Sequence, residues 1–172
     1  VWFVSSNGKL LGLTYVPEQQ IGAWHQHDTD GVFESCAVVA EGSEDRLYVI
    51  VNRTINGATV RIVERLASRQ FVDQADAFFV DCGLTYDSTP ATVISGLDHL
   101  EGKTVSILAD GAVHPQRVVT SGSITLDNEA SKVHIGLPIT ADLVTLPVSM
   151  QIDNAFGQGR AKNVNRACLR VY

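Results

Sequence analysis

The sequence RLYVIVNRTINGATVRIVERL, residues 46–66, gives the clearest indication of the fold class of this chain. Its first half places Leu47, Val49 and Val51 on one face of an extended strand, because successive side chains of a strand point to opposite faces. Asn56-Gly57 then interrupts the run, and this dipeptide suits the two positive φ angles of a type I′ turn. The stretch is therefore predicted to form an antiparallel β-hairpin.

The same turn signal recurs along the chain. Asn7-Gly8 separates VWFVS from KLLGLTY, DTDGV at residues 28–32 separates GAWHQH from VFESCAVV, and Asp110-Gly111 separates KTVSILA from AVHPQRVV. Helical periodicity is nearly absent, and residues 67–76 hold at most a turn or two of helix between the two halves. We therefore predict an all-β protein built around an antiparallel meander.

Two regions follow from this pattern. Residues 1–70 are predicted to be a β-meander with a wide polar loop at residues 40–46, and residues 76–172 a small β-barrel or sandwich. The strands expected in the second region are DAFFVDCGLTY, ATVIS, KTVSILA, AVHPQRVV, GSITLD, KVHIGLPI, LVTLPVSM and NVNRACLRVY. Because proline lacks the ladder N–H, the strands that hold Pro115, Pro138 and Pro147 should lie at sheet edges or bulge there.

Composition narrows the function classes. The chain has 172 residues, 45% of them hydrophobic and 19% charged, with a formal net charge of −6. This acidic balance argues against a surface that grips nucleic acid, since affinity for duplex DNA comes mainly from Lys and Arg. The three cysteines, Cys36, Cys82 and Cys168, form no CxxC pair and are expected to be buried free thiols. No apolar run is long enough to span a bilayer, so no membrane span is expected.

The stretch WHQHDTDG, residues 24–31, contains the strongest candidate for metal binding. On a strand, His25 and His27 would point to the same face and could supply two ligands to one ion. The third ligand is the difficulty, because Asp28 would face the other side and Asp30 would sit in the turn. The alternative is a polar strand face whose opposite side buries Trp24. The alternative is favoured, and no metal site is predicted.

The sequence contains no recognisable catalytic motif. The sequence has no GxSxG, HExxH, P-loop or GxGxxG that opens a helix. The carboxylate pairs Glu44-Asp45 and Asp98 with Glu101 fall in predicted turns and are interpreted as solvated loop charges. Four arginines lie on or beside the hairpin of residues 46–69, and we interpret them as part of a solvated sheet face in preference to a binding patch. They are Arg53, Arg61, Arg65 and Arg69. We therefore expect no enzyme activity, no catalytic residue and no cofactor.

A longer stretch carries a family resemblance. The sequence SGLDHLEGKTVSILADGAVHPQRVVTSGSITLDNEASKVHIGLPITADLVTLP, Ser95 to Pro147, resembles a segment of structural proteins of phage tails and prophages. LLGLTYVPEQQIGAWHQHDTDGVFESCAVV and EDRLYVIVNRTINGATVRIVERL resemble the part that precedes it. The family implied is the tail nozzle family of short-tailed phages, the tail tubular protein B type.

The resemblance implies a propeller-blade-like meander for residues 1–70 and an inserted small β domain for residues 76–172. The second region also looks like the FCCH barrel of ubiquitin-activating enzymes, in shape only. Because the nozzle proteins are several times longer and this chain starts at Val1, we expect a fragment of a longer polypeptide; the alternative is a shortened relative of those proteins.

The function implied is a non-enzymatic structural virion component. It would form part of a ring-shaped nozzle or tube, a homo-hexamer in the full-length protein, through which DNA passes without specific binding. The expected partners are other phage tail proteins and further copies of the chain. The expected location is the virion, preceded by the cytoplasm of the bacterial host. The alternative is a β-domain adaptor that binds a host-surface protein or glycan.

Overall fold

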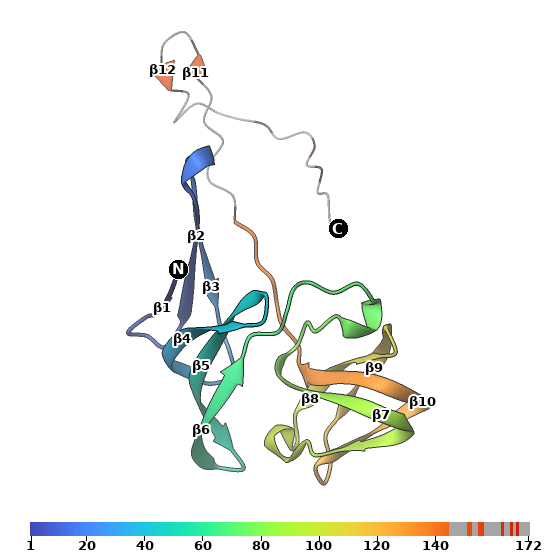
Figure 1. Cartoon of the computed structure of the whole chain (residues 1–172). Coiled ribbons are helices and arrows are strands. Elements are labelled where there is room, and N and C mark those ends of the chain that lie inside the picture. Colours follow the sequence, from blue (N-terminus) through green and yellow to red (C-terminus); the bar gives the residue numbers. More distant parts are fainter. Residues whose placement is uncertain (145–150, 153–154, 157–162, 164–165, 167, 169–172) are drawn as a thin grey trace. The chain divides into compact units, whose positions relative to one another are not determined.

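A computed structural model describes residues 1–144, 151–152, 155–156, 163, 166 and 168. The described part is built from antiparallel strands with three short 3-10 turns, so the all-β prediction is confirmed. The first sheet has the order β1-β2-β3, the second β4-β5-β6 and the third β7-β10-β8-β9 (Figure 1).

The first two sheets come from the predicted meander. Their strands are β1 (Trp2–Val4), β2 (Leu10–Val16), β3 (Ile21–His27), β4 (Val32–Glu41), β5 (Glu44–Ile55) and β6 (Ala58–Arg65). Each sheet has three strands, whereas a propeller blade has four. On β5, Leu47, Val49 and Val51 are buried in one cluster with Leu10 and Phe33, as the alternation predicted.

Two of the predicted turns have the expected geometry. Asn56 and Gly57 have φ angles of 50° and 78°, and Asp110 and Gly111 have 46° and 80°, which are the paired positive values of type I′ turns. The strands close directly on either side, with Ile55 paired to Ala58 and Ala109 to Ala112.

The other two turn predictions differ in outcome: the hairpin predicted around Asn7-Gly8 is confirmed by the antiparallel pairing of β1 with β2, but its turn type is wrong, and the hairpin predicted at residues 28–32 is absent. At Asn7-Gly8 only Gly8 has a positive φ, and the amide N–H of Gly8 donates to the Ser5 carbonyl, so the connection is a longer loop. At residues 28–31 the chain passes from β3 to β4, which belong to different sheets and do not form a hairpin. A turn signal specifies local backbone shape, and long-range packing decides whether the flanking strands pair.

The wide polar loop predicted at residues 40–46 is also absent. β4 and β5 continue until Glu41 pairs with Glu44, which leaves only Gly42 and Ser43 in the loop. Gly42 has a φ of 61°, and glycine at the first loop position is the pattern of a type II′ turn. The helical residues expected within 67–76 amount to one 3-10 turn, η2 (Gln74–Asp76).

The third sheet joins strands that the sequence had split. DAFFVDCGLTY and ATVIS merge into β7 (Asp81–Ser95), and GSITLD and KVHIGLPI into β10 (Ser123–Leu137). Together with β8 (Thr104–Ala109) and β9 (Ala112–Val118) they enclose a second cluster of buried residues that includes Ile94, Leu97, Val105, Val133 and Ile135. Within residues 81–137 this sheet does not close into the predicted barrel, because β7 and β9 remain edges.

Of the three proline predictions, the one for Pro115 is confirmed and the one for Pro138 is not. Pro115 lies on β9, an edge strand, at a register shift between the Val105–Arg117 and Ile107–His114 pairs, as predicted. Pro138 follows the last residue of β10, so proline ends a central strand there and does not force it to an edge. Pro147 lies outside the described residues.

By the clustering of its backbone contacts, the chain divides into residues 1–139 and 140–172. In the second unit, β11 (Gln151–Ile152) pairs with β12 (Ala155–Phe156). The strands predicted for LVTLPVSM and NVNRACLRVY fall largely outside the described residues. None of the helical segments that the structure describes has the length and apolar character required to cross a membrane.

Candidate functional site

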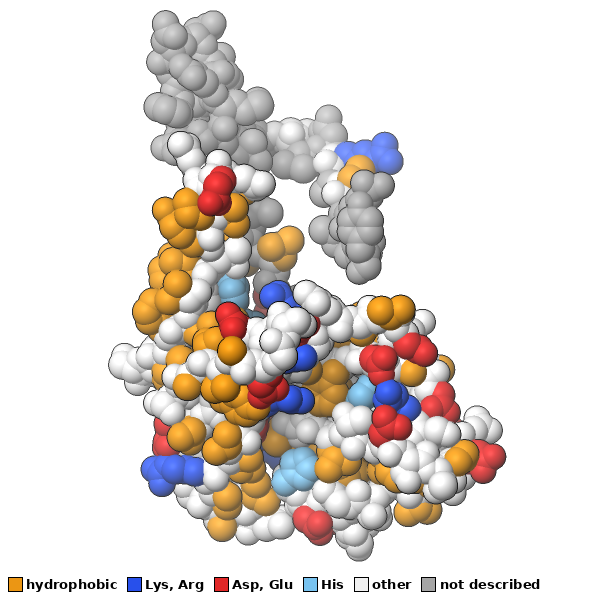
Figure 2. Space-filling view, viewed as in Figure 1, with side chains coloured by type: hydrophobic (Ala, Val, Ile, Leu, Met, Phe, Trp, Pro, Cys, Tyr) orange, Lys and Arg blue, Asp and Glu red, His pale blue; other side chains and the backbone are white. Residues whose placement is uncertain are grey.

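One face of the β1-β2-β3 sheet is apolar and uncovered. Phe3, Tyr15 and Trp24 are 46%, 64% and 65% exposed. Leu11, Leu13 and Tyr15 alternate on one face of β2. Phe3 pairs with Leu11 and Trp24 pairs with Leu13, so strand register places the three aromatic side chains on that face. Figure 2 shows hydrophobic side chains along this part of the molecule. The prediction that Trp24 is buried is therefore wrong, since no element of residues 1–139 covers its face.

The opposite face of the same sheet carries the histidine pair. His25 and His27 do share a face, as their spacing predicted, and His25 Nδ1 lies 2.9 Å from His27 Nε2. Both rings lie against the indole of Trp2, at centroid distances of 5.2 and 5.5 Å. Burial and, after it, the nearby His25 lower the pKa of His27 below its ordinary value of 6.5. The neutral imidazole is therefore the favoured form of His27.

The remaining histidines of the described chain lie elsewhere. His99 Nε2 is 3.1 Å from the Cys82 carbonyl oxygen, and His114 Nε2 accepts from the Asp127 amide at 2.9 Å. His134 is buried and bridges the Thr85 hydroxyl and the Ala75 carbonyl. Within the described residues no three His, Cys, Asp or Glu side chains gather as they would around a metal ion.

Two arginines of the predicted cluster form exposed ion pairs. Arg61 Nε lies 2.6 Å from a Glu34 carboxylate oxygen, and Arg65 contacts Glu41 at 2.8 Å. The hydrogen bond from Arg61 lowers the pKa of Glu34. Each of these two cations is already matched by a carboxylate, so they add little positive potential for a phosphate ligand.

Arg53 differs from this surface pattern. Its side chain is only 3% exposed, and it donates two hydrogen bonds to Glu64, at 2.6 and 2.8 Å, and one to the Asp30 carbonyl at 2.8 Å. The interpretation as a solvated residue is wrong for Arg53. The signal was present in the sequence, because Arg53 continues the inward series of Leu47, Val49 and Val51 at spacing two.

Arg53 also joins the meander to the third sheet. Its guanidinium lies 3.3 Å from Asp81 at the start of β7, and the Thr29 hydroxyl donates to the same carboxylate at 2.7 Å. Burial alone lowers the pKa of Arg53, but the hydrogen bonds to Glu64 and the charge of Asp81 outweigh it, so the net pKa is raised. The adjacent Cys82 thiol is half-buried, and burial raises its pKa to about 11. This arrangement stabilises a permanent cation and a protonated thiol.

The predicted loop carboxylates have structural partners. Glu44 pairs with Arg46 at 2.9 Å and accepts a hydrogen bond from Ser68. Glu101 accepts from the amides of Ser121 and Gly122 at 2.9 and 2.7 Å. Both are therefore engaged in holding turns.

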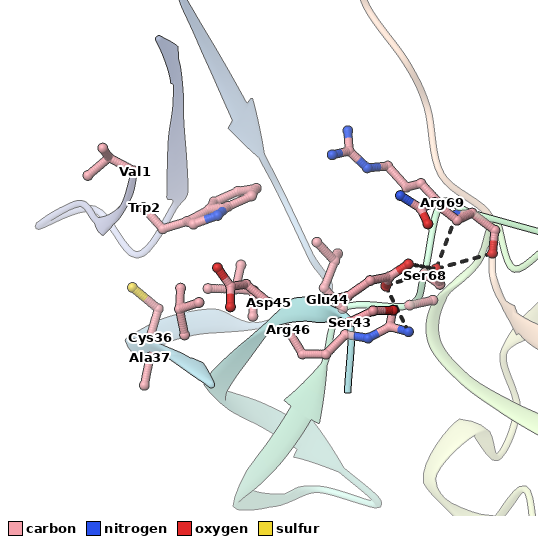
Figure 3. Close-up of a pocket in the computed structure, with 15 residues that line it drawn as sticks. Val1, Trp2, Cys36, Ala37, Ser43, Glu44, Asp45, Arg46, Ser68 and Arg69 are labelled. Atoms are coloured by element: carbon pink, nitrogen blue, oxygen red, sulfur yellow. Dashed lines mark hydrogen bonds and ion pairs between the residues drawn. The ribbon is translucent and has the colours of Figure 1, made fainter. Parts of the chain in front are cut away.

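An open groove of about 970 Å³ lies beside Glu44, Arg46 and Ser68. Val1 and Trp2 line it from one side and residues 66–70 from another (Figure 3). The only buried side-chain nitrogen or oxygen of the described residues without a hydrogen-bond partner is Arg46 Nε. The arginine is nevertheless neutralised by Glu44, so the groove presents mixed polarity and no concentrated charge.

Compared with models of known protein families and with curated protein sequences, the chain matches none of them.

Proposed function

We propose that this chain is a structural component of a phage or prophage tail, part of a ring-shaped nozzle or tube through which DNA passes. The observation that carries the proposal is the uncovered apolar face of β1-β2-β3, with Phe3, Tyr15 and Trp24 exposed. Contiguous exposed apolar surface of this kind marks a protein interaction site. A component that works only in an assembly presents such a face before its neighbours cover it.

The occupant of this face in the proposal is a second copy of the chain. The strand positions on the face, Phe3, Leu11, Leu13, Tyr15 and Trp24 among them, include no charged side chain. Each copy carries a net charge of −6, so two copies repel unless they meet through an uncharged surface. The apolar face meets this requirement and buries aromatic side chains, which dominate interface energetics. Other tail proteins would contact the remaining surfaces.

The net negative charge of the chain is compatible with the passage of DNA. Arg61 and Arg65 are paired with Glu34 and Glu41 of the neighbouring strand β4, and the whole chain has a net charge of −6. Such a wall repels phosphates mildly and lets a duplex slide. The resulting protein acts in the virion, after assembly in the host cytoplasm, with no catalytic step.

The test has two arms. In the first, virions of the encoding phage are purified, the polypeptide that contains this sequence is sought by mass spectrometry, and the tail is imaged by electron microscopy. We expect the polypeptide in stoichiometric amounts, as a ring with six-fold symmetry. Absence from virions, or a particle without ring symmetry, refutes the proposal. Specific retention on a glycan array would favour the alternative, a β-domain adaptor for the host surface.

The second arm tests the surface. Trp24→Ser removes the most exposed aromatic side chain of the face, and Val113→Ser is the matched control, because Val113 is 86% exposed on β9. We expect Trp24→Ser to reduce assembly of tailed particles and Val113→Ser to leave it unchanged. Equal assembly in the two variants would show that the face is not the contact between copies.

A further inference from the structure

We propose that His25 and His27 form a two-histidine chelate for a divalent late transition-metal ion, copper(II) or nickel(II). The pair is placed by β3, where residues two apart share a face. Their nitrogens, His25 Nδ1 and His27 Nε2, face each other at 2.9 Å. His25 is exposed and His27 half-buried, so an ion can reach the pair from solvent. This site is independent of the proposed role in a tail.

The 2.9 Å contact is a hydrogen bond of the metal-free pair, so the rings must turn slightly before both lone pairs can converge on one ion. With metal–imidazole bonds of about 2.05 Å, two ligands at a right angle lie about 2.9 Å apart and tetrahedral ligands about 3.3 Å apart, so the nitrogens are already within the span of one ion. The choice of ion rests on ligand chemistry: imidazole suits copper(II) and nickel(II), and copper(II) binds most strongly in the divalent series.

Neighbouring residues keep the two rings close to each other. His25 lies directly over Gly12, where a Cβ would fall 2.1 Å from the ring carbon Cε1, so the absence of a side chain makes room for the imidazole. Trp2 packs against both rings. A ligand pair that is already ordered loses less conformational entropy when it binds an ion.

Coordination requires one tautomer of each ring. In the metal-free pair one nitrogen donates its proton to the other across the 2.9 Å contact. To bind, both facing nitrogens must present lone pairs, so the protons reside on His25 Nε2 and His27 Nδ1. No other bond changes.

The charged groups around the pair leave the remaining coordination positions to water. Asp28, next in the chain, is engaged by Lys9 at 2.9 Å. Arg69 is close enough to lower the pKa of His27, whereas Asp28 raises it. Since no third His, Cys, Asp or Glu side chain joins the pair in the described part of the chain, the ion is held by two protein ligands and exchanges readily.

Trp2 provides a direct readout. The chain has two tryptophans, so a Trp24→Phe background leaves the Trp2 indole, 5.2 and 5.5 Å from the two imidazoles, as the sole fluorophore of its kind. Titration with copper(II) should quench this fluorescence saturably. Loss of even an outer-shell partner commonly costs about tenfold or more in metal affinity, so His25→Gln and His27→Gln should each weaken binding at least about tenfold.

His114→Gln is the matched control, since His114 is bound to the Asp127 amide and has no histidine neighbour on its strand. It should leave the titration unchanged. An added N-terminal residue should also leave it unchanged, which separates the site from the α-amino group of Val1. The electron paramagnetic resonance spectrum of the copper(II) form should show coupling to two nitrogens.

Three outcomes overturn the inference. The first is absence of saturable quenching, and the second is equal copper affinity in the His25→Gln/His27→Gln double variant. The third is a spectrum that reports oxygen ligands alone. Circular dichroism of each variant establishes that the β fold is retained, so that a lost titration is assigned to the ligands.

Discussion

Truncation of Arg53 should cost far more stability than truncation of a neighbouring arginine with an equally short ion pair. In Arg53→Ala, a side chain that is 3% exposed loses its contacts to Glu64, Asp81 and the Asp30 carbonyl. Removal of one partner of a buried ion pair typically costs about 3 to 5 kcal/mol, because the other charge stays desolvated. Glu64 and Asp81 retain 21% and 22% exposure and regain some water, so we expect about 3 kcal/mol.

Arg61→Ala is the matched control. Arg61 lies on β6, opposite Asn52 of β5, and its nitrogen is also 2.6 Å from a carboxylate, but its side chain is 67% exposed. Exposed ion pairs contribute little because water and salt screen them. We therefore expect the urea midpoint of Arg61→Ala to stay close to that of the unmodified chain.

The assay is urea unfolding followed by circular dichroism and by tryptophan fluorescence. Arg53→Lys should fall between the two alanine variants, because it keeps the charge but loses the two-pronged contact with Glu64. The reasoning is refuted if Arg53→Ala and Arg61→Ala unfold at the same urea concentration. It is also refuted if Arg53→Lys is as unstable as Arg53→Ala.

Three further outcomes are expected from the same geometry. Burial lowers the pKa of His27 below 6.5 in the folded chain, so the unfolded chain binds the proton more readily. The stability that neutral His27 contributes is therefore complete above pH 6.5 and is lost as the pH falls through the pKa of His27 in the folded chain. As the pH is lowered through this range, the urea midpoint of His27→Gln should fall less steeply than that of the unmodified chain. Equal dependence of the two midpoints on pH would contradict the assignment. Cys82, whose thiol pKa is raised to about 11, should react with a disulfide reagent at pH 8 more slowly than the exposed Cys168, and an equal rate in single-cysteine variants would count against it. Gly57→Ala should lower stability by about 1 kcal/mol, because φ is 78° and nothing crowds a new Cβ, so strain alone acts. Gly22→Ala, where φ is not in the positive range, is its control and should show no such loss by thermal denaturation.

The class of fold and several local details follow from the amino-acid sequence alone. Spacing-two alternation predicted the buried series of β5, since a strand has no other way to segregate its side chains. The turns at Asn56-Gly57 and Asp110-Gly111 follow from which residues tolerate positive φ, a property of two adjacent residues. The shared face of His25 and His27 follows from the same strand period.

Which strands pair and which side chains are buried depend on long-range packing in the folded chain. The DTDG segment contains good turn residues, yet β3 and β4 join different sheets, because pairing depends on the apolar surface that distant strands bury. Trp24 is exposed and Arg53 buried, the reverse of what their residue types suggest, because burial depends on what packs against a face. Local backbone preferences extend over two to four residues, whereas the partners of Arg53 lie up to 28 positions away in the sequence. Only the folded chain brings those groups together.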